Sequence, residues 1–152
     1  MQSNELLSHW QQLCGTDLGT TEWLTVDQAR IDSFADTTLD HQVIHIDPDA
    51  DATKKLGGTI AHGFLSLSLL SYLSSTLTSP HVAGHSILNY GLNRVRFLMP
   101  VPSGSDIRLH MKVVQAQEKS QGVLVTYNSE LEIRDQDKPA FIAEHLALLL
   151  FH

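Results

Sequence analysis

Apolar residues are spaced in two different ways along the chain, and the pattern changes near residue 85. Before this point the spacing is mostly helical, and after it the spacing is almost entirely that of strands. At the start of the chain Leu6, Trp10 and Leu13 recur at helical intervals, and Gly15 follows as a stop signal. This predicts a short amphipathic helix inside an N-terminal helical extension, residues 1–19.

Two more short helices are predicted before the pattern changes. Thr25 and Gln28 have the spacing of a capping box, and the apolar face behind them indicates a helix that ends before Asp40. Asp47 directly before Pro48 is typical of another helix start, because Asp caps the first N–H groups and Pro fits the first helical position. We therefore expect the chain to re-enter a helix at this pair.

The longest predicted helix covers about residues 62–77. Its leucines and aromatic residues fall on every face and are interleaved with serines. A helix that is apolar all round is normally buried, and small serines let neighbouring backbone approach closely. We expect this segment to be the central helix of the core.

Four strands are predicted in the second half of the chain. The first two alternate and should be half-buried, while the last two are long extended segments (94–97, 107–113, 123–133 and 141–150). Short connections permit antiparallel pairing but no helical crossover, which favours an antiparallel meander. With the central helix covering one face, the predicted class is α+β: an antiparallel sheet wrapped around one long helix, in a single domain of residues 1–152.

Charge and composition argue against several classes of partner. The chain has 10 Lys and Arg residues against 17 Asp and Glu residues, a formal net charge of −7, so a nucleic-acid backbone would meet net repulsion. Lys54-Lys55 and Arg94 with Arg96 are interpreted as solvated charges that could still hold phosphate groups of a small ligand. The first residues lack the basic start and apolar segment of a secretory signal, so we expect none, and no apolar run approaches the roughly 20 residues that span a bilayer. We expect a cytoplasmic protein with neither nucleic-acid nor membrane partners.

One short segment concentrates groups that can exchange protons. Asp40, His41, His45 and Asp47 fall within eight positions. The β-branched residues between them predict an irregular or extended loop, and loops on a rigid scaffold often carry catalytic residues. His45 can accept or donate a proton near neutrality, and the carboxylate of Asp40, five residues earlier, can approach the same substrate atom. Such a pair could hold a water molecule between them.

The start of the central helix offers a second chemical group. His62-Gly63 opens the helix, whose first N–H groups are unpaired and lie at the positive end of the helix dipole. The amide of Gly63 allows close approach and would stabilise negative charge on a thioester carbonyl oxygen. Structural interpretations stay open beside these: Asp40 as a turn former and His62 as a helix-start residue, while Asp47 is assigned to capping.

Metal and thiol chemistry are not expected. His41 and His45, four residues apart, could be ligands only on a helix, which the β-branched residues between them disfavour. Cys14 is the sole cysteine, so an intrachain disulfide cannot form. Its place in a predicted amphipathic helix favours a core position over a nucleophilic one.

Two motifs carry a family resemblance. Asp40-His-Gln-Val-Ile-His45-Ile-Asp-Pro48, followed by Gly58-Thr-Ile-Ala-His-Gly63-Phe-Leu, resembles the MaoC-like dehydratases, the hot dog fold family that includes (R)-specific enoyl-CoA hydratases. The later Asn89-Tyr-Gly-Leu-Asn-Arg-Val-Arg-Phe97 looks like the nodulation protein N-like branch. The resemblance covers about residues 20–150, and it implies a dimer with coenzyme A bound near the subunit interface.

The resemblance also implies residue roles. Asp40 and His45 would be the acid–base pair that adds or removes water, Gly63 would supply the oxyanion amide, and Ser71 is similar to a helix serine near the acyl pocket. On the same motifs, the residues expected to contact substrate are His62, Phe64, Ser71, Asn89, Tyr90 and Gly91. Leu39 stands where the family commonly has Gly, and Gln42-Val43 replaces its Asn-Pro.

The expected function is therefore reversible hydration of an enoyl-CoA across its 2,3-bond. The expected substrate is an acyl-CoA, with coenzyme A as part of the substrate, no separate cofactor and no metal, and the expected assembly is a homodimer. A hot dog acyl-CoA thioesterase and a non-catalytic acyl-CoA-binding protein are the alternatives. The joint presence of Asp40, His45 and Gly63 favours the hydratase, because a pure binder has no need for a paired acid and base.

Overall fold

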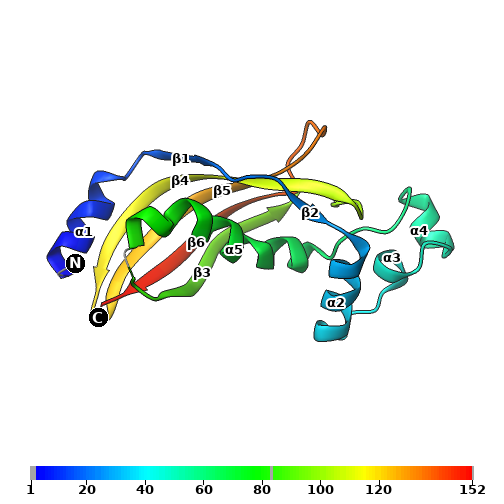
Figure 1. Cartoon of the computed structure of the whole chain (residues 1–152), viewed down its shortest axis with the longest axis horizontal. Helices are drawn as coiled ribbons and strands as arrows, with labels where there is room; N and C mark the ends of the chain where they lie inside the picture. Colours follow the sequence, from blue (N-terminus) through cyan, green and yellow to red (C-terminus); the bar gives the residue numbers. More distant parts are fainter. Residues whose placement is uncertain (1–2, 83, 152) are drawn as a thin grey trace.

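The sheet curves around one long helix in the computed structural model, which describes residues 3–82 and 84–151 (Figure 1). Within these residues the helices are α1 (Ser3–Gln12), α2 (Gln28–Thr38), α3 (Val43–Ile46), α4 (Asp51–Lys55) and α5 (Gly63–Val82). The strands are β1 (Asp17–Thr20), β2 (Leu24–Val26), β3 (Ile87–Phe97), β4 (Ser105–Lys119), β5 (Gly122–Ile133) and β6 (Phe141–Leu150). Helix α5 lies in the concave side of the sheet, and α2, α3 and α4 gather at the end opposite the two termini (Figure 1). The predicted α+β class is confirmed.

The strand order is β1-β4-β5-β6-β3, all antiparallel, with β2 also paired to β4. Strands β4, β5 and β6 form the predicted meander. The prediction that β3 also belongs to this meander is wrong. Instead of pairing with β4, β3 lies at the other edge of the sheet and pairs with β6 from Ile87↔Leu149 to Phe97↔Phe141. The physical reason is that β1 and β2 already occupy the outer edge of β4, so the free edge of the sheet is at β6. Strand β3 is thus an edge strand.

The helix starts near residue 25 and residue 47 differ from the predicted ones. Asp27, not Thr25, caps α2, because its carboxylate accepts a hydrogen bond from the Arg30 N–H at 2.9 Å. Asp47 caps no helix start: its carboxylate accepts from the Asp49 N–H at 2.9 Å in a turn, and the next helix begins at Asp51. Each Asp uses its side chain on the nearest unpaired backbone N–H, which spacing alone does not specify.

Helix α5 is buried on one face only, in contrast to the expected burial on all sides. Leu65 and Leu73 lie in the core, but the side chains of Phe64 and Tyr72 are 69% and 59% exposed. Strand β3, expected to be half-buried, is exposed along its length except at Val95. One chain therefore leaves an uncovered apolar surface along α5 and β3, and its exposed large side chains are Phe64, Tyr72, Ile87, Leu88, Tyr90, Leu92 and Phe97. None of the helices formed by residues 3–82 and 84–151 combines the length and apolar character of a membrane crossing.

The N-terminal helix contributes to the core. Leu6 and Trp10 of α1 are fully buried, and the Trp10 ring meets Tyr127 edge to face at 5.8 Å. Cys14 is exposed, contrary to the expected core position. The reason is that α1 ends at Gln12, and the N–H of Gly15 already bonds the Val113 carbonyl of β4, so Cys14 lies in the turn between helix and sheet.

A histidine lies among the residues of the sheet that face α5. His145 of β6 is 7% exposed; its Nδ1 is hydrogen-bonded to the hydroxyl of Ser129 at 2.9 Å, and its ring stacks on Tyr127 at 4.8 Å. Burial lowers the pKa of His145 to about 4, because the charged imidazolium loses its hydration there. His145 is therefore neutral at physiological pH.

This burial predicts acid-sensitive stability. An unfolded chain binds a proton at His145 below a pKa of about 6.5, whereas the folded chain does so only near pH 4, so the free energy of unfolding should fall by about 3 kcal/mol between those values. Thermal unfolding of the parent and of His145→Gln at pH 7 and pH 5 measures this. The melting temperature of the parent should fall further between pH 7 and pH 5 than that of the variant. Equal decreases would contradict the lowered pKa of His145.

Candidate active site

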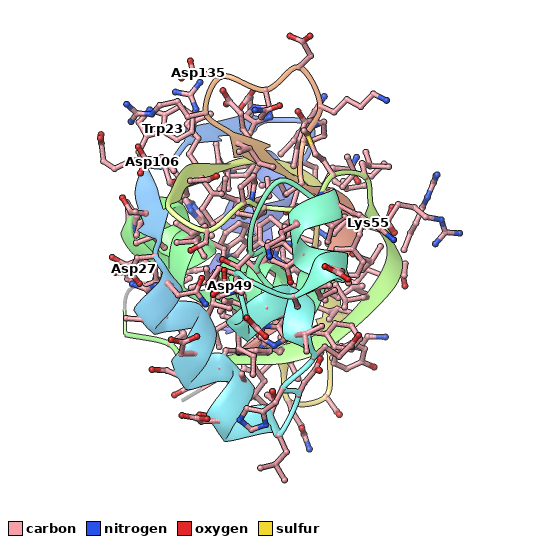
Figure 2. All side chains as sticks on the ribbon, turned by 90° about the vertical axis from the view of Figure 1, so that its right-hand side faces the viewer. Trp23, Asp27, Asp49, Lys55, Asp106 and Asp135 are labelled. Atoms are coloured by element: carbon pink, nitrogen blue, oxygen red, sulfur yellow. The ribbon has the colours of Figure 1, made fainter. Side chains whose placement is uncertain are left out.

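Helices α2, α3 and α4 bring the Asp40–Asp47 segment against the start of α5. Figure 2 looks onto this end of the molecule, with Asp27 at the first turn of α2 and Asp49 between α3 and α4. The C-cap of helix α2 is Leu39, a non-glycine residue with φ of 63°. Glycine is favoured at such a left-handed position because it carries no Cβ. The strained cap turns the chain sharply, and Asp40 follows it directly.

His45 lies on α3, a single helical turn, where the sequence predicted an irregular or extended loop. The turn is held by side chains from outside it. The Gln28 amide of α2 donates to the His45 carbonyl at 2.7 Å and accepts from the Thr59 hydroxyl at 2.6 Å. The hydroxyl of Thr53 donates to the Val43 carbonyl at 3.0 Å. These contacts explain why β-branched residues are accommodated in a helical turn: neighbouring elements satisfy its backbone groups.

The hydrogen bonds of the two buried histidines decide which ring nitrogens carry protons. His45 is 6% exposed, and its Nδ1 lies 2.8 Å from the Ile60 carbonyl oxygen. His62 is 3% exposed, and its Nε2 lies 2.9 Å from the Asp40 carbonyl oxygen. A carbonyl oxygen only accepts, so both of these nitrogens must donate. In the neutral rings, Nε2 of His45 and Nδ1 of His62 therefore carry lone pairs.

Asp40, His45 and His62 converge. One carboxylate oxygen and one nitrogen from each ring lie within 4.8 Å of one another. The two rings stack with centroids 3.7 Å apart, and Phe34 packs on His62 at 4.9 Å. The carboxylate of Asp40 receives only a long bond of 3.4 Å from the Gln42 N–H. A half-buried carboxylate and an imidazole are thus placed so that a water molecule or a substrate hydroxyl could contact both.

The same three side chains are the donor set that could hold a metal ion in the described part of the chain. Two imidazoles and a carboxylate suit zinc and similar ions, and each ring is oriented by a backbone carbonyl, as metal-bound histidines usually are. His41 and His45, considered from the sequence as a pair of ligands, do not come together. His41 is exposed, and its Nε2 is hydrogen-bonded to the carboxylate of Asp36 at 2.8 Å. The Nδ1 atom of His62 has no hydrogen-bond partner among the described residues.

Beside this cluster lies a mostly apolar cavity of about 310 Å³. His45 and Gly63 both line it, and Ser66 is a buried residue of the same lining. As the first residue of α5, Gly63 has an N–H that the helix itself does not use. A Cβ at Gly63 would lie 3.3 Å from the Phe97 ring, so the lack of a side chain keeps this wall of the cavity open.

The remaining predicted contact residues lie on α5 and on strand β3 beside it. Ser71 donates to the side-chain oxygen of Asn89 at 3.1 Å, and both line a second hollow with Tyr90 and Gly91. Phe64 does not line the first cavity itself. Its exposed ring packs edge to face, with centroids 6.2 Å apart, on Phe97, which does line that cavity. The predicted residues therefore fall into two groups: the catalytic candidates with His62 at the start of α5, and the rest beside β3.

Sequence reasoning missed several groups that shape the site. Gln28 was assigned to a capping box, yet it links α2 to α3 and to Thr59 across 17 and 31 positions. Phe34 of α2 packs on the His62 ring, and Ser66 of α5 lines the cavity; neither residue belongs to the motifs that indicated the site. Contacts at such separations leave no periodic signal in the chain, so only the fold reveals them.

Comparisons with known proteins show which family the chain is related to. A protein-family model described as "MaoC like domain" matches residues 9–133. The chain is 44% identical over 140 residues to "Nodulation protein N" of Rhizobium leguminosarum bv. viciae, which covers 90% of this chain and 86% of that one. It is 38% identical over 148 residues to "3-hydroxyacyl-thioester dehydratase Z" of Mycobacterium tuberculosis, covering 96% of this chain and 97% of that one.

Solved structures share the fold. A monoamine oxidase regulatory protein from Archaeoglobus fulgidus superposes with a TM-score of 0.76 at 27% identity, covering 91% of both chains. An (R)-hydratase from A. caviae superposes with a TM-score of 0.72 at 23% identity, covering 90% of this chain and 96% of that one. These neighbours confirm the predicted hot dog arrangement. With a family model that spans most of its length and relatives of this identity, the chain belongs to the family of proteins with a MaoC-like dehydratase domain.

Proposed function

We propose that this protein is a hydro-lyase that adds water to, or removes it from, the 2,3-bond of an enoyl-CoA. The observation that carries the proposal is the convergence of Asp40 and His45 within 4.8 Å beside a cavity that Gly63 also lines. A hydration needs an acid and a base for the water and a donor for the thioester carbonyl oxygen. A dehydratase among the relatives, named for 3-hydroxyacyl thioesters, supports the same reaction class.

In the proposed mechanism, His45 and Asp40 handle the water. The Nδ1–H of His45 is engaged by Ile60, so Nε2 can accept a proton as the water oxygen attacks C3. Asp40 orients the water, and the pair returns a proton to C2. The N–H of Gly63 stabilises the negative charge that develops on the carbonyl oxygen. In the reverse direction the same groups remove the C2 proton and protonate the leaving hydroxyl.

Replacing either member of the pair should abolish most turnover. Asp40→Asn and His45→Gln are each expected to lower kcat by about 10²–10⁴, the usual contribution of general acid–base catalysis. Loss of the conjugated double bond of crotonyl-CoA is the assay. Asp36→Asn and His41→Gln are matched controls, because these residues bond each other on the exposed surface nearby and should keep the parent rate. Parent-like rates for both Asp40→Asn and His45→Gln would refute the assignment.

Two substitutions separate the hydrogen bond donated by the Gly63 N–H from the space that the missing side chain leaves open. Both Gly63→Ala and Gly63→Pro place a Cβ against the Phe97 ring, but only proline removes the N–H, and proline is tolerated at the first position of a helix. We expect kcat for Gly63→Pro to fall about 10²–10³ below that of Gly63→Ala. Equal rates for the two variants would exclude the amide as the donor.

The crotonyl-CoA assay also distinguishes the alternatives. Water directed at the carbonyl carbon instead of C3 would release free coenzyme A, so thiol release would identify a thioesterase. Binding of acyl-CoA without loss of either the double bond or the thioester would identify a non-catalytic binding protein. Hydration is favoured because His45 and Gly63 line the same cavity and Asp40 lies within 4.8 Å of the His45 ring, so an acid–base pair is available in addition to the oxyanion donor.

We also propose a homodimer formed through the uncovered apolar surface of α5 and β3. An exposed edge strand beside exposed apolar side chains is suited to pairing with a second copy. Tyr72, 59% exposed on α5, is a suitable probe. The parent should have twice the 16.9 kDa chain mass in light scattering, and Tyr72→Glu should shift it toward one chain. Gln117→Glu, an exposed position on β4, should remain dimeric. A monomeric parent, or an unaffected Tyr72→Glu, would contradict the proposal.

A further inference from the structure

Helix α5 and strand β3 run side by side in opposite directions and form a seam. At one end Gly63 faces Phe97, and farther along Ser71 bonds Asn89. Ser71 follows Gly63 by eight positions, which corresponds to about 12 Å along the helix. A chain bound with its carbonyl oxygen at Gly63 and extended along this seam would therefore reach the Ser71–Asn89 contact.

Two adjoining hollows of about 270 Å³ each open at this place. They share Leu70, Ser71, Asn89 and His145 in their walls. The rest of one wall is rich in hydroxyl groups, contributed by Ser74, Ser75, Thr78 and Tyr127. The hydroxyls of Ser74, Ser75 and Thr78 already donate to carbonyl oxygens of α5, and the remaining lining is largely apolar. The choice between a plain and a polar chain therefore depends on His145, whose imidazole an unsubstituted chain would desolvate without replacing a hydrogen bond.

His145 is the most informative group in these walls. It lies on the core-facing side of β6, where its neighbours along the strand are alanines and other apolar residues. Its Nδ1 is engaged by Ser129, a residue 3% exposed, and Tyr127 holds the ring plane by stacking. The Nε2 atom is then the ring nitrogen left for a ligand. A buried and oriented imidazole in a hollow is a built hydrogen-bonding site.

The lining fits a neutral ligand group. Among the described residues that line the two hollows there is no Asp, Glu, Lys or Arg. Burial also keeps His145 neutral, because its pKa is lowered to about 4. A carboxylate placed here would lose its hydration without a countercharge, whereas a hydroxyl or keto oxygen needs only a hydrogen bond.

We propose that these hollows bind a neutral oxygen function, a hydroxyl or keto group, on the acyl chain roughly eight to ten carbon atoms beyond the thioester carbonyl. His145 is the residue that selects for it. The inference deepens the proposed hydration, because it assumes that the thioester lies at Gly63.

Three ten-carbon substrates that differ only at the far end test the proposal: trans-2-decenoyl-CoA, its 10-hydroxy derivative and its 10-carboxylate analogue. The parent should hydrate the hydroxy substrate with a kcat/KM at least about tenfold above that of the other two, because a site built for a hydrogen bond discriminates strongly. Equal values, or a preference for the plain or the carboxylate chain, would overturn the proposal.

Variants then assign the selection to His145. His145→Leu should lose the preference for the hydroxy substrate, and His145→Gln should retain part of it. Crotonyl-CoA is too short to reach the hollows, so both variants should hydrate it at the parent rate, which also shows that they fold. Retention of the full preference in His145→Leu would contradict the role of this residue.

A binding measurement separates this proposal from the proposed reaction. Saturated 10-hydroxydecanoyl-CoA and decanoyl-CoA can be titrated into the parent by calorimetry without any turnover. Tighter binding of the hydroxy ligand by about tenfold or more supports the polar subsite even if no enoyl-CoA is hydrated, and equal affinities refute it even if crotonyl-CoA is a good substrate.

Discussion

The hydrogen bond between Nδ1 of His45 and the carbonyl oxygen of Ile60 is the contact on which the proposed chemistry depends. It fixes the ring in place and fixes its tautomer, since the nitrogen facing a carbonyl must carry the hydrogen. In the neutral ring the lone pair is then on Nε2, the nitrogen proposed as the base. Gln28 reinforces the arrangement by holding the backbone of His45, and the His62 ring supports the same imidazole by stacking. The short helix α3 is therefore rigid through contacts made by other elements.

The second constraint is the uneven covering of α5. A helix that is apolar on all faces can be buried on only one side by a single sheet, so the opposite side and the edge strand β3 stay exposed. The seam between them contains both the thioester end and the polar hollows of the proposed substrate path. If two copies meet at this surface, dimer formation and substrate binding use the same residues, and the second copy would close the seam against water.

Much of the fold could be predicted because its signals are long. The twenty residues of α5 and the strands β4, β5 and β6 carry enough periodicity to be recognised, and the motif with Asp40, His45 and Gly63 is compact in sequence. Short elements were less accessible: α3 has four residues, and its stability comes from Gln28 and Thr53 rather than from its own sequence. The place of β3 depended on which strand edge remained free, a property of the whole sheet. The exposure of Cys14 followed from a helix end two residues earlier than its pattern indicates.

A crystal structure of the protein with a non-hydrolysable 3-hydroxyacyl-CoA analogue, in which a methylene replaces the thioester sulfur, tests the central claim most directly. The account predicts the analogue's carbonyl oxygen within hydrogen-bonding distance of the Gly63 N–H and its 3-hydroxyl between the carboxylate of Asp40 and Nε2 of His45. An analogue bound elsewhere, or bound with its hydroxyl away from both side chains, would contradict it.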